Sequence, residues 1–318
     1  MKEYKIGKNE ANQRLDKYLH KLLKEASNGF LYKMLRKKNI TLNEKRAEGT
    51  EHLTEGDVVK LFLSDDTFEK FCGETETESF LTPGTNGQTL PLDIIFENED
   101  ILIINKPQGM LSQKAKQTDV SANEYIIDYL IKSKKLTTEE LKTFRPSVCN
   151  RLDRNTSGLL IAGKSLSGLQ QMAEALKLRS MKKYYRCVVK GEIKEAKNIC
   201  GFLLKNETTN KVSISTQEIK GSKYIETEYR PIAVKNGMTL LEVHLITGRS
   251  HQIRAHLASM GHPIAGDGKY GAVRWNESLR SQYHIKAQML HAYRLVFPDG
   301  FEVIAPMPEE FGLFFEER

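Results

Sequence analysis

A single carboxylate between two arginines stands just before an apolar run. The stretch CNRLDRNTSGLLIAGKS covers residues 149–165 and places Asp153 in this position. The apolar run at 159–162 predicts a buried strand, whereas the other RLD tripeptide, at 14–16, falls in a helical pattern where its charges are ordinary surface groups. Asp153 is therefore predicted on a loop that enters the core, where a rigid scaffold commonly holds reactive groups. An ionised carboxylate there could stabilise positive charge that develops on a substrate.

Cysteine chemistry is the alternative at this position. Cys149 lies four residues before Asp153 and could be a nucleophile, although a small buried thiol is the more ordinary interpretation. The four cysteines are widely separated and form no C-x-x-C pair. We therefore expect no zinc site and no disulfide framework.

The overall charge favours a polyanionic partner. The chain has 318 residues, enough for more than one domain, with a formal net charge of +7 and a pI of about 9.0. Two basic clusters, at 30–46 and 177–190, flank an acidic stretch at 65–78, which indicates two binding surfaces and a linker. The sequence has no apolar run of the roughly 18 residues that a membrane span needs, and no apolar signal segment at its start. We expect a cytoplasmic protein without membrane contact.

The elements of the first 64 residues are predicted from periodicity. Leucines at helical spacing predict a helix over 12–26, and a second, basic helix fits 28–39. A strand and turn follow at 40–46, and a turn and apolar strand fill 51–63.

This arrangement over 12–64 resembles the S4 domain, a small RNA-binding module; a generic basic helical hairpin is the alternative. The resemblance implies phosphate contacts, and hence salt-sensitive and largely sequence-independent affinity. The side chains that it assigns to these contacts are Lys33, Arg36, Lys37 and Lys38.

A polar stretch rich in turn residues, 65–90, is the predicted linker to a second domain over 91–318. That domain opens with two apolar strands around a turn at 97–100, and Lys106-Pro107 ends the second strand. The sequence shows no long internal repeat, which excludes a solenoid.

Four blocks of the second domain, in order, resemble the RluA family of pseudouridine synthases. NRLDRNTSGLLIAGKS matches the family signature H-R-L-D-x-x-T-S-G-L. The other blocks are FENEDILIINKPQGM at 96–110, KKYYRCVVKG at 182–191, and LITGRSHQIRAHLASMGHPIAGDGKYG at 245–271 followed by MLHAYRL at 289–295. The likeness spans about 91–306. It implies an α+β protein: a small S4-like α/β module, then a catalytic domain with a mixed, largely antiparallel central sheet and an RNA-binding cleft.

The resemblance also implies a reaction, the isomerisation of uridine in RNA without a cofactor or a metal. The N1–C1′ bond breaks, the uracil turns while it is held, and a C5–C1′ bond forms. Breaking a glycosidic bond places positive charge on the sugar, and a carboxylate beside C1′ stabilises it. The family assigns this carboxylate to Asp153; addition to C1′ and removal of a proton from C2′ both stay open.

Two partners of Asp153 follow from the same resemblance. Arg254, in the H-Q-[IL]-R block, corresponds to the arginine that keeps the acid ionised and aimed; a surface helical arginine is the alternative. Tyr185, at the K-x-Y position, could stack on the uracil and assist proton transfer at C5. Tyr184 is the competing assignment, and on a strand the two side chains point to opposite faces.

Base chemistry inside folded RNA requires the nucleotide to leave its stack. Arg151 corresponds to the arginine that fills the vacated space, with phosphate contact alone as the alternative. Leu290 resembles an apolar wall of the pocket, with ordinary core packing as the alternative. Asn150 stands where the family usually has histidine, and Asn155 where it commonly has aspartate, so a histidine that positions Arg151 is not expected here.

Two weaker patterns support no site of their own. GDGKYG at 266–271 satisfies G-x-G-x-x-G, but it lacks the strand–turn–helix context of a dinucleotide site. The gaps between His251, His256 and His262 do not place metal ligands on one helix face, so structural or RNA-contacting roles are favoured.

The sequence thus predicts an RNA pseudouridine synthase that acts as a monomer on structured RNA. Large-subunit ribosomal RNA is the favoured substrate and transfer RNA the second. A non-catalytic ribosome-assembly protein would explain the charge equally well, but not the filled Asp, Tyr and Arg positions. A nucleoside glycosidase normally needs a second carboxylate or a water, and no paired acid lies near Asp153 in the sequence.

Overall fold

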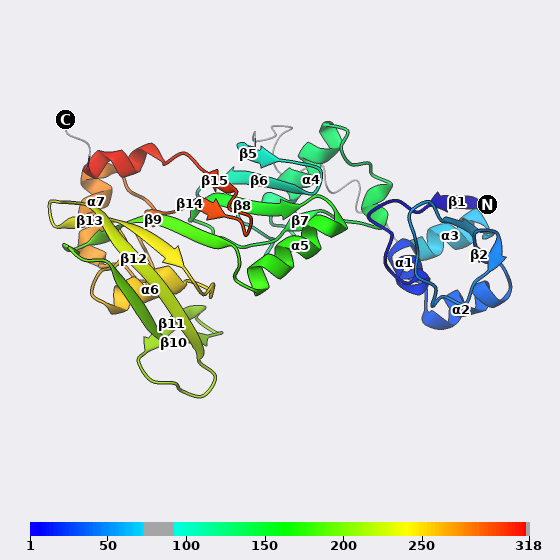
Figure 1. The fold of residues 1–318 in the computed structure, drawn as a ribbon, viewed down its shortest axis with the longest axis horizontal. Helices are drawn as coiled ribbons and strands as arrows, with labels where there is room; N and C mark the ends of the chain where they lie inside the picture. Colours follow the sequence, from blue (N-terminus) through cyan, green and yellow to red (C-terminus); the bar gives the residue numbers. More distant parts are fainter. Residues whose placement is uncertain (73–91, 316–318) are drawn as a thin grey trace.

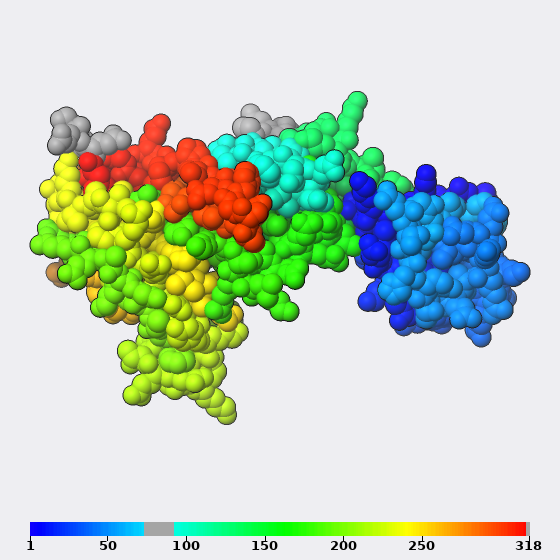
Figure 2. Space-filling model, viewed as in Figure 1, coloured from blue at the N-terminus to red at the C-terminus, as the bar shows by residue number. Residues whose placement is uncertain are grey.

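The computed structural model describes residues 1–72 and 92–315. Figures 1 and 2 show two lobes, a small N-terminal module at one end of the molecule and a larger domain that contains the rest. The two touch through polar contacts: Thr143 Oγ1 donates to Glu10 Oε1 at 2.7 Å, and the Leu166 amide donates to Asn9 Oδ1 at 3.0 Å. No helix in the described parts is both long and apolar enough to cross a bilayer.

The N-terminal module packs three helices against a four-stranded sheet of order β1-β4-β2-β3. Its elements are β1 (Lys2–Lys5), α1 (Leu15–Leu22), α2 (Asn28–Arg36), β2 (Ile40–Leu42), β3 (Lys45–Arg46), β4 (Val58–Leu61) and α3 (Asp65–Cys72). Helix α1 buries Leu15, Leu19 and Leu22, and the Ser27 side chain caps α2 by accepting from the Phe30 amide. Helix α1 is shorter than the predicted 12–26, because Asn12 is left-handed and Arg14 is extended.

The described elements extend beyond the predicted 12–64 at both ends. Strand β1 pairs antiparallel with β4, although its sequence KEYK carries little apolar signal. Residues 65–72 of the predicted linker form α3, and Phe68 is buried against Tyr4 with ring centroids 6.4 Å apart. Residues 65–72 form a helix, and not the start of a linker, because Phe68 packs into the apolar core of the module. Residues 73–90 of the predicted linker lie outside the described residues.

The larger domain is built on one eleven-stranded sheet of order β11-β10-β12-β13-β9-β14-β8-β6-β5, with β15 beside β14 and β7 beside β8. Neighbouring strands of this sheet pair antiparallel, except that β14 and β8 run parallel. The predicted α+β class with a mixed, largely antiparallel sheet is confirmed. The strands are β5 (Ile94–Glu97), β6 (Ile101–Lys106), β7 (Ser147–Val148), β8 (Ser157–Gly163), β9 (Lys182–Lys190), β10 (Lys197–Asn206), β11 (Lys211–Ser215), β12 (Lys223–Lys235), β13 (Met238–Leu245), β14 (Leu290–Val296) and β15 (Glu302–Ile304).

Helices flank this sheet, and one of them, α6, carries Arg254. They are α4 (Ala122–Lys132), α5 (Leu166–Lys177), α6 (Gln252–Ser259) and α7 (Val273–Tyr283), with short 3-10 turns at Glu140–Lys142 and Glu309–Phe314. Figure 1 shows α6 lying against the sheet at β12, and the helix also contacts β11. Helix α4 begins at a capping box formed by Ser121 and Glu124.

Strand β8 fixes the position of the loop that carries Asp153. All seven of its residues are buried, as the apolar run predicted. Gly158, at φ +106°, lies where a Cβ would come within 2.2 Å of the Ala292 carbonyl oxygen. Only glycine allows β14 to approach the start of β8 so closely, and β8 begins four residues after Asp153.

Two buried histidines predict an acid-sensitive fold. His256 and His291 are 2% and 0% exposed, and burial lowers the pKa of each to about 4. Below pH ~6.5 these two histidines become protonated in the unfolded chain but stay neutral in the folded protein. The free energy of unfolding should therefore fall as the pH drops towards 4. The loss approaches about 1.4 kcal/mol per pH unit for each histidine. Urea unfolding of wild type and the His256→Asn/His291→Asn variant at pH 7, 6 and 5 checks this; equal pH slopes would contradict it.

Candidate active site

Three distant segments meet around Asp153. The acid lies on the loop between β7 and β8, Arg254 lies on α6, and Tyr185 lies on β9. Ser112 fixes the loop, because its Oγ donates to the Leu152 carbonyl at 2.9 Å and accepts from the Leu152 amide at 3.0 Å. These two bonds hold the backbone of Leu152 and so restrict the position of Asp153, the next residue.

The Arg254 guanidinium binds two carboxylates at once. Its Nη1 donates to Asp153 Oδ2 at 2.6 Å, while Nε and Nη2 donate to Asp267 Oδ2 and Oδ1 at 2.7 and 2.8 Å. Asp267 is 1% exposed and also accepts from the Lys269 and Tyr270 amides. A two-point bond of this kind fixes the plane of the guanidinium as well as its charge.

Burial and pairing oppose each other in this group. Burial alone would lower the pKa of Arg254, but bonding to Asp267 and the charge of Asp153 hold that pKa above its ordinary value. Burial alone would raise the pKa of Asp267, but the Arg254 guanidinium holds it below the usual range. Arg254 is therefore charged, and it presents one N–H to Asp153.

Asp153 remains accessible while its partner is enclosed. Its side chain is 27% exposed, against 8% for Arg254 and 0% for Asp267. Oδ2 is held by Arg254, and Oδ1 has no hydrogen bond within the described residues. One oxygen of an anchored carboxylate is thus free to face a substrate.

The two neighbouring tyrosines of β9 point to opposite faces, as strand geometry requires. Tyr185 is 6% exposed and packs in the same apolar cluster as Leu290. Burial, followed by the charge of Asp153, raises the pKa of Tyr185, so its phenol stays protonated near that acid. Tyr184 instead stacks on His244 and lies under the Arg294 guanidinium. The geometry therefore places Tyr185, and not Tyr184, on the Asp153 side.

The remaining residues singled out in the sequence make no bond to this group within the described residues. Arg151 is exposed, two residues before the acid, and has no ion pair within the described residues. Exposed side chains at Lys33, Arg36, Lys37 and Lys38 lie in the other lobe, on α2 and the turn after it. Cys149 is partly buried, and burial raises the pKa of its thiol to about 11, which argues against a thiolate nucleophile.

Sequence reasoning missed two charged residues of the site, Lys106 and Asp267. Lys106 is 0% exposed, and its Nζ donates to the carbonyls of Pro107, Met110 and Arg154 at 2.9, 2.9 and 3.1 Å. Burial lowers the pKa of Lys106 to about 8, against the opposing effect of Asp153. The sequence feature that could have indicated Lys106 is a lysine at the end of a buried strand. The feature for Asp267 is the loop GDGKYG, in which this aspartate binds Arg254.

We expect Lys106→Met to weaken both the fold and the site. The change leaves three carbonyls without their donor, one of them next to Asp153, and should lower the free energy of unfolding by about 2 kcal/mol. Lys164→Met is the matched control, because Lys164, the residue after β8, binds Glu97 at the end of β5 at 2.6 Å and makes no bond to the Asp153 loop within the described residues. Urea unfolding and turnover measured where both variants are folded check this. Equal turnover in the two variants would contradict a role for Lys106 at the site.

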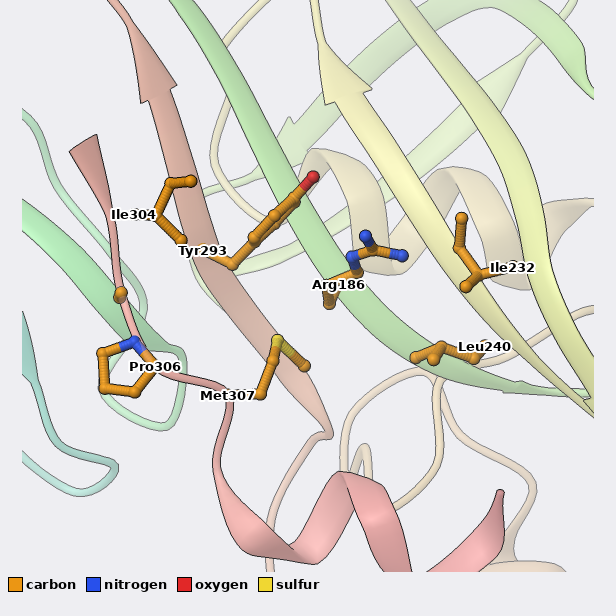
Figure 3. Close-up of a pocket in the computed structure, with 8 residues that line it drawn as sticks. Arg186, Ile232, Leu240, Tyr293, Ile304, Pro306 and Met307 are labelled. Atoms are coloured by element: carbon orange, nitrogen blue, oxygen red, sulfur yellow. The ribbon is translucent and has the colours of Figure 1, made fainter. Parts of the chain in front are cut away.

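A separate hollow lies on the opposite face of the sheet. It is lined by Arg186, Ile232, Leu240, Tyr293, Ile304, Ala305, Pro306 and Met307 (Figure 3). Arg186 follows Tyr185 on β9 and so points away from Asp153. This hollow is not part of the Asp153 site. Within the described residues, no three histidine, cysteine or carboxylate side chains are grouped to hold a metal ion.

Comparison with known proteins gives consistent matches. The family model described as RNA pseudouridylate synthase matches residues 100–259. Ribosomal large subunit pseudouridine synthase C of Vibrio vulnificus (strain CMCP6) is 31% identical over 316 residues, covering 96% of this chain and 92% of that protein. Ribosomal large subunit pseudouridine synthase D of Borreliella burgdorferi is 31% identical over 259 residues, covering 80% and 76%.

Two solved structures share the fold of the larger part of the chain. Human RNA Pseudouridylate Synthase Domain Containing 1 aligns with a TM-score of 0.55 and 24% identity, over 70% of this chain and 86% of that one. Human RNA Pseudouridylate Synthase Domain Containing 4 aligns with a TM-score of 0.54 and 21% identity, over 69% and 89%.

Proposed function

The chain belongs to the RNA pseudouridylate synthase family, and on that premise we propose that it converts uridine to pseudouridine in large-subunit ribosomal RNA. The observation that carries the proposal is the carboxylate of Asp153, half-enclosed and bound at one oxygen by Arg254. The names of the bacterial relatives favour ribosomal RNA over transfer RNA.

Asp153 is the reactive group in this proposal. Its free Oδ1 lies beside C1′ of the target nucleoside and stabilises the positive charge that develops when the N1–C1′ bond breaks. Arg254 holds Oδ2 of this acid and leaves Oδ1 to face the substrate. Tyr185 lies beneath the detached uracil with a protonated phenol, and Leu290 forms part of the apolar wall. The C5 proton leaves when the C5–C1′ bond forms and N1 takes up a proton in its place, so the reaction is an isomerisation and consumes no co-reactant.

Arg151 and the N-terminal module bind the rest of the RNA. An exposed guanidinium two residues from the acid can enter the stack that the target nucleotide leaves, or bind a flanking phosphate. The module, as an S4-like domain, adds phosphate contacts at a distance from the site. We expect the protein to act as a cytoplasmic monomer without a cofactor.

Mapping of pseudouridine in cellular RNA with and without the gene tests the substrate. We expect one or a few uridines of large-subunit ribosomal RNA to lose the modification, and the purified protein to restore it on a transcript of that RNA. Loss confined to transfer RNA would overturn the ribosomal assignment. Unchanged RNA, with no product from the purified protein, would overturn the function.

The basic surface of the module should make a measurable electrostatic contribution to RNA binding. Replacing Lys33, Arg36 and Lys37 by Gln and Lys38 by Asn removes four exposed cations, Asn being chosen because Lys38 is left-handed. The slope of log affinity against log salt should fall by about 0.7–0.9 for each phosphate that the module no longer neutralises. Gln replacement of Lys17 and Lys24, two lysines elsewhere on the module, is the control. Equal slopes in both variants would contradict the assignment.

A further inference from the structure

An imidazole that the mechanism has not used faces the reactive acid. His251 lies at the start of α6 in a left-handed conformation, with φ 54°. Its Nε2 lies 3.9 Å from Asp153 Oδ1, and its Nδ1 lies 2.9 Å from the Tyr270 hydroxyl. The side chain is 12% exposed, so its ring is held in place.

The contacts on both sides of the ring favour one position for its proton. The Val212 amide donates to the Tyr270 hydroxyl oxygen at 2.9 Å. The single hydroxyl proton of Tyr270 is then free to point at His251 Nδ1, and the other tautomer would turn the Nε2 lone pair towards the Asp153 carboxylate 3.9 Å away, so Nδ1 is assigned as the acceptor. A neutral imidazole whose Nδ1 is an acceptor carries its proton on Nε2. His251 therefore presents an N–H donor towards Asp153.

The ring is neutral in this environment. Four charged side chains face it: Asp153 and Asp267, which favour protonation, and Arg254 and Lys269, which oppose it. Burial is the largest influence and, with the two cations, it lowers the pKa of His251.

A donor and an acceptor thus face each other across a gap. At 3.9 Å the two atoms are too far apart for a hydrogen bond. Neither atom has another hydrogen bond within the described residues. One oxygen about 2.8 Å from each can fill the gap, but only if it accepts from His251 and donates to Asp153. A hydroxyl group does both, and a carbonyl oxygen does not.

We propose that His251 and Asp153 together bind the 2′-hydroxyl of the target nucleoside. This inference rests on the proposed function, which places C1′ beside Asp153 and therefore the neighbouring C2′ hydroxyl within reach of the same carboxylate. The pair recognises a ribonucleoside and discriminates against a deoxyribonucleoside, because the 2′-hydroxyl distinguishes RNA from DNA. Tyr270 is a positioning residue that sets the tautomer of His251.

A cycle of protein and substrate changes tests the contact. The substrate is an RNA fragment that contains the mapped uridine and that the wild-type protein modifies, made with uridine or with 2′-deoxyuridine at that position. Single-turnover rates are measured for wild type, His251→Asn and His251→Gln. Asn tolerates the left-handed backbone but cannot reach the gap, whereas the longer Gln side chain can carry an N–H donor there.

We expect the deoxy substitution to slow wild type at least tenfold, as loss of a hydrogen-bonded group does. The penalty, defined as the ratio of the rates on the uridine and 2′-deoxyuridine substrates, should shrink about tenfold in His251→Asn and be partly retained in His251→Gln. His262→Asn, a matched histidine whose Nδ1 bonds the Lys190 carbonyl, should keep the wild-type penalty. An equal penalty in wild type and His251→Asn, or none in wild type, would overturn the contact while leaving the proposed function intact.

The tautomer is tested separately by 15N-histidine NMR of the full-length protein. Wild-type His251 should show a proton on Nε2 only. Tyr270→Phe removes the hydroxyl donor, and the His251 signal should shift towards a mixture of tautomers. A proton on Nδ1 in wild type would overturn the donor role of Nε2.

Discussion

Asp153→Asn should abolish pseudouridine formation while the protein stays folded and binds RNA with unchanged affinity. The amide has nearly the shape of the carboxylate but no charge to place beside C1′, and it leaves Arg254 bound to Asp267. We expect a fall in single-turnover rate on the order of 10³-fold or more. Mass spectrometry of the product RNA and an RNA-binding titration, run side by side, measure the two effects.

The control for this change is Asp119→Asn. Asp119 accepts hydrogen bonds from the nearby Ala115 and Lys116 amides, and within the described residues it bonds neither Arg254 nor Tyr185. The Asp119→Asn variant should keep a single-turnover rate within about twofold of wild type. A wild-type rate from folded Asp153→Asn would contradict the assignment of Asp153 as the catalytic carboxylate.

Arg254→Met should damage both stability and activity. Asp267 is 1% exposed and takes both of its side-chain ion-pair bonds from this guanidinium. Removing one member of a buried pair leaves a buried charge uncompensated and destabilises by about 3–5 kcal/mol. The rate should fall by at least about a hundredfold, because Asp153 loses the group that orients it. Urea unfolding and single-turnover kinetics at a temperature where the variant is folded measure both effects.

Two further variants separate the roles of Arg254. Arg254→Lys keeps the charge but cannot bond Asp267 at two points, so it should lie between wild type and Arg254→Met in rate and stability. Arg254→Met/Asp267→Asn removes the uncompensated acid and should recover stability without recovering the rate. Activity of Arg254→Met within a few-fold of wild type would contradict the pairing of Asp153 with Arg254.

The balance of charges explains why these effects should be large. Two carboxylates, Asp153 and Asp267, are offset by two enclosed cations, Arg254 and Lys106. Little water screens any of them except Asp153. Arg254 bonds the accessible acid directly, and Lys106 bonds the carbonyl of the residue that follows it.

The sequence predicted the position of the Asp153 loop because its signals are local. The change from a charged tripeptide to the apolar run of β8 places Asp153 at the edge of the core, and strand alternation separates Tyr184 from Tyr185. The order of four motif blocks was enough to indicate the family and the sheet class. Strand alternation and motif order are properties of contiguous residues, so one chain is enough to show them.

The missed features depend on contacts between distant segments. Nothing near Asp267 in the sequence indicates that its partner is thirteen residues upstream on a helix. Lys106 was interpreted only as the end of a strand, since its three carbonyl partners come from loops that meet in the folded protein. Strand β1 and helix α3 were missed because pairing with β4 and contact of Phe68 with Tyr4 stabilise them, and not their own periodicity.

The most direct test of the account follows the hydrogen that must leave C5. RNA containing the mapped uridine, labelled with tritium at C5, is incubated with wild type and with Asp153→Asn without added cofactor. We predict one tritium released for each pseudouridine formed by wild type, and none released by the variant. Tritium release by Asp153→Asn at the wild-type rate, or free uracil in place of pseudouridine, would contradict it.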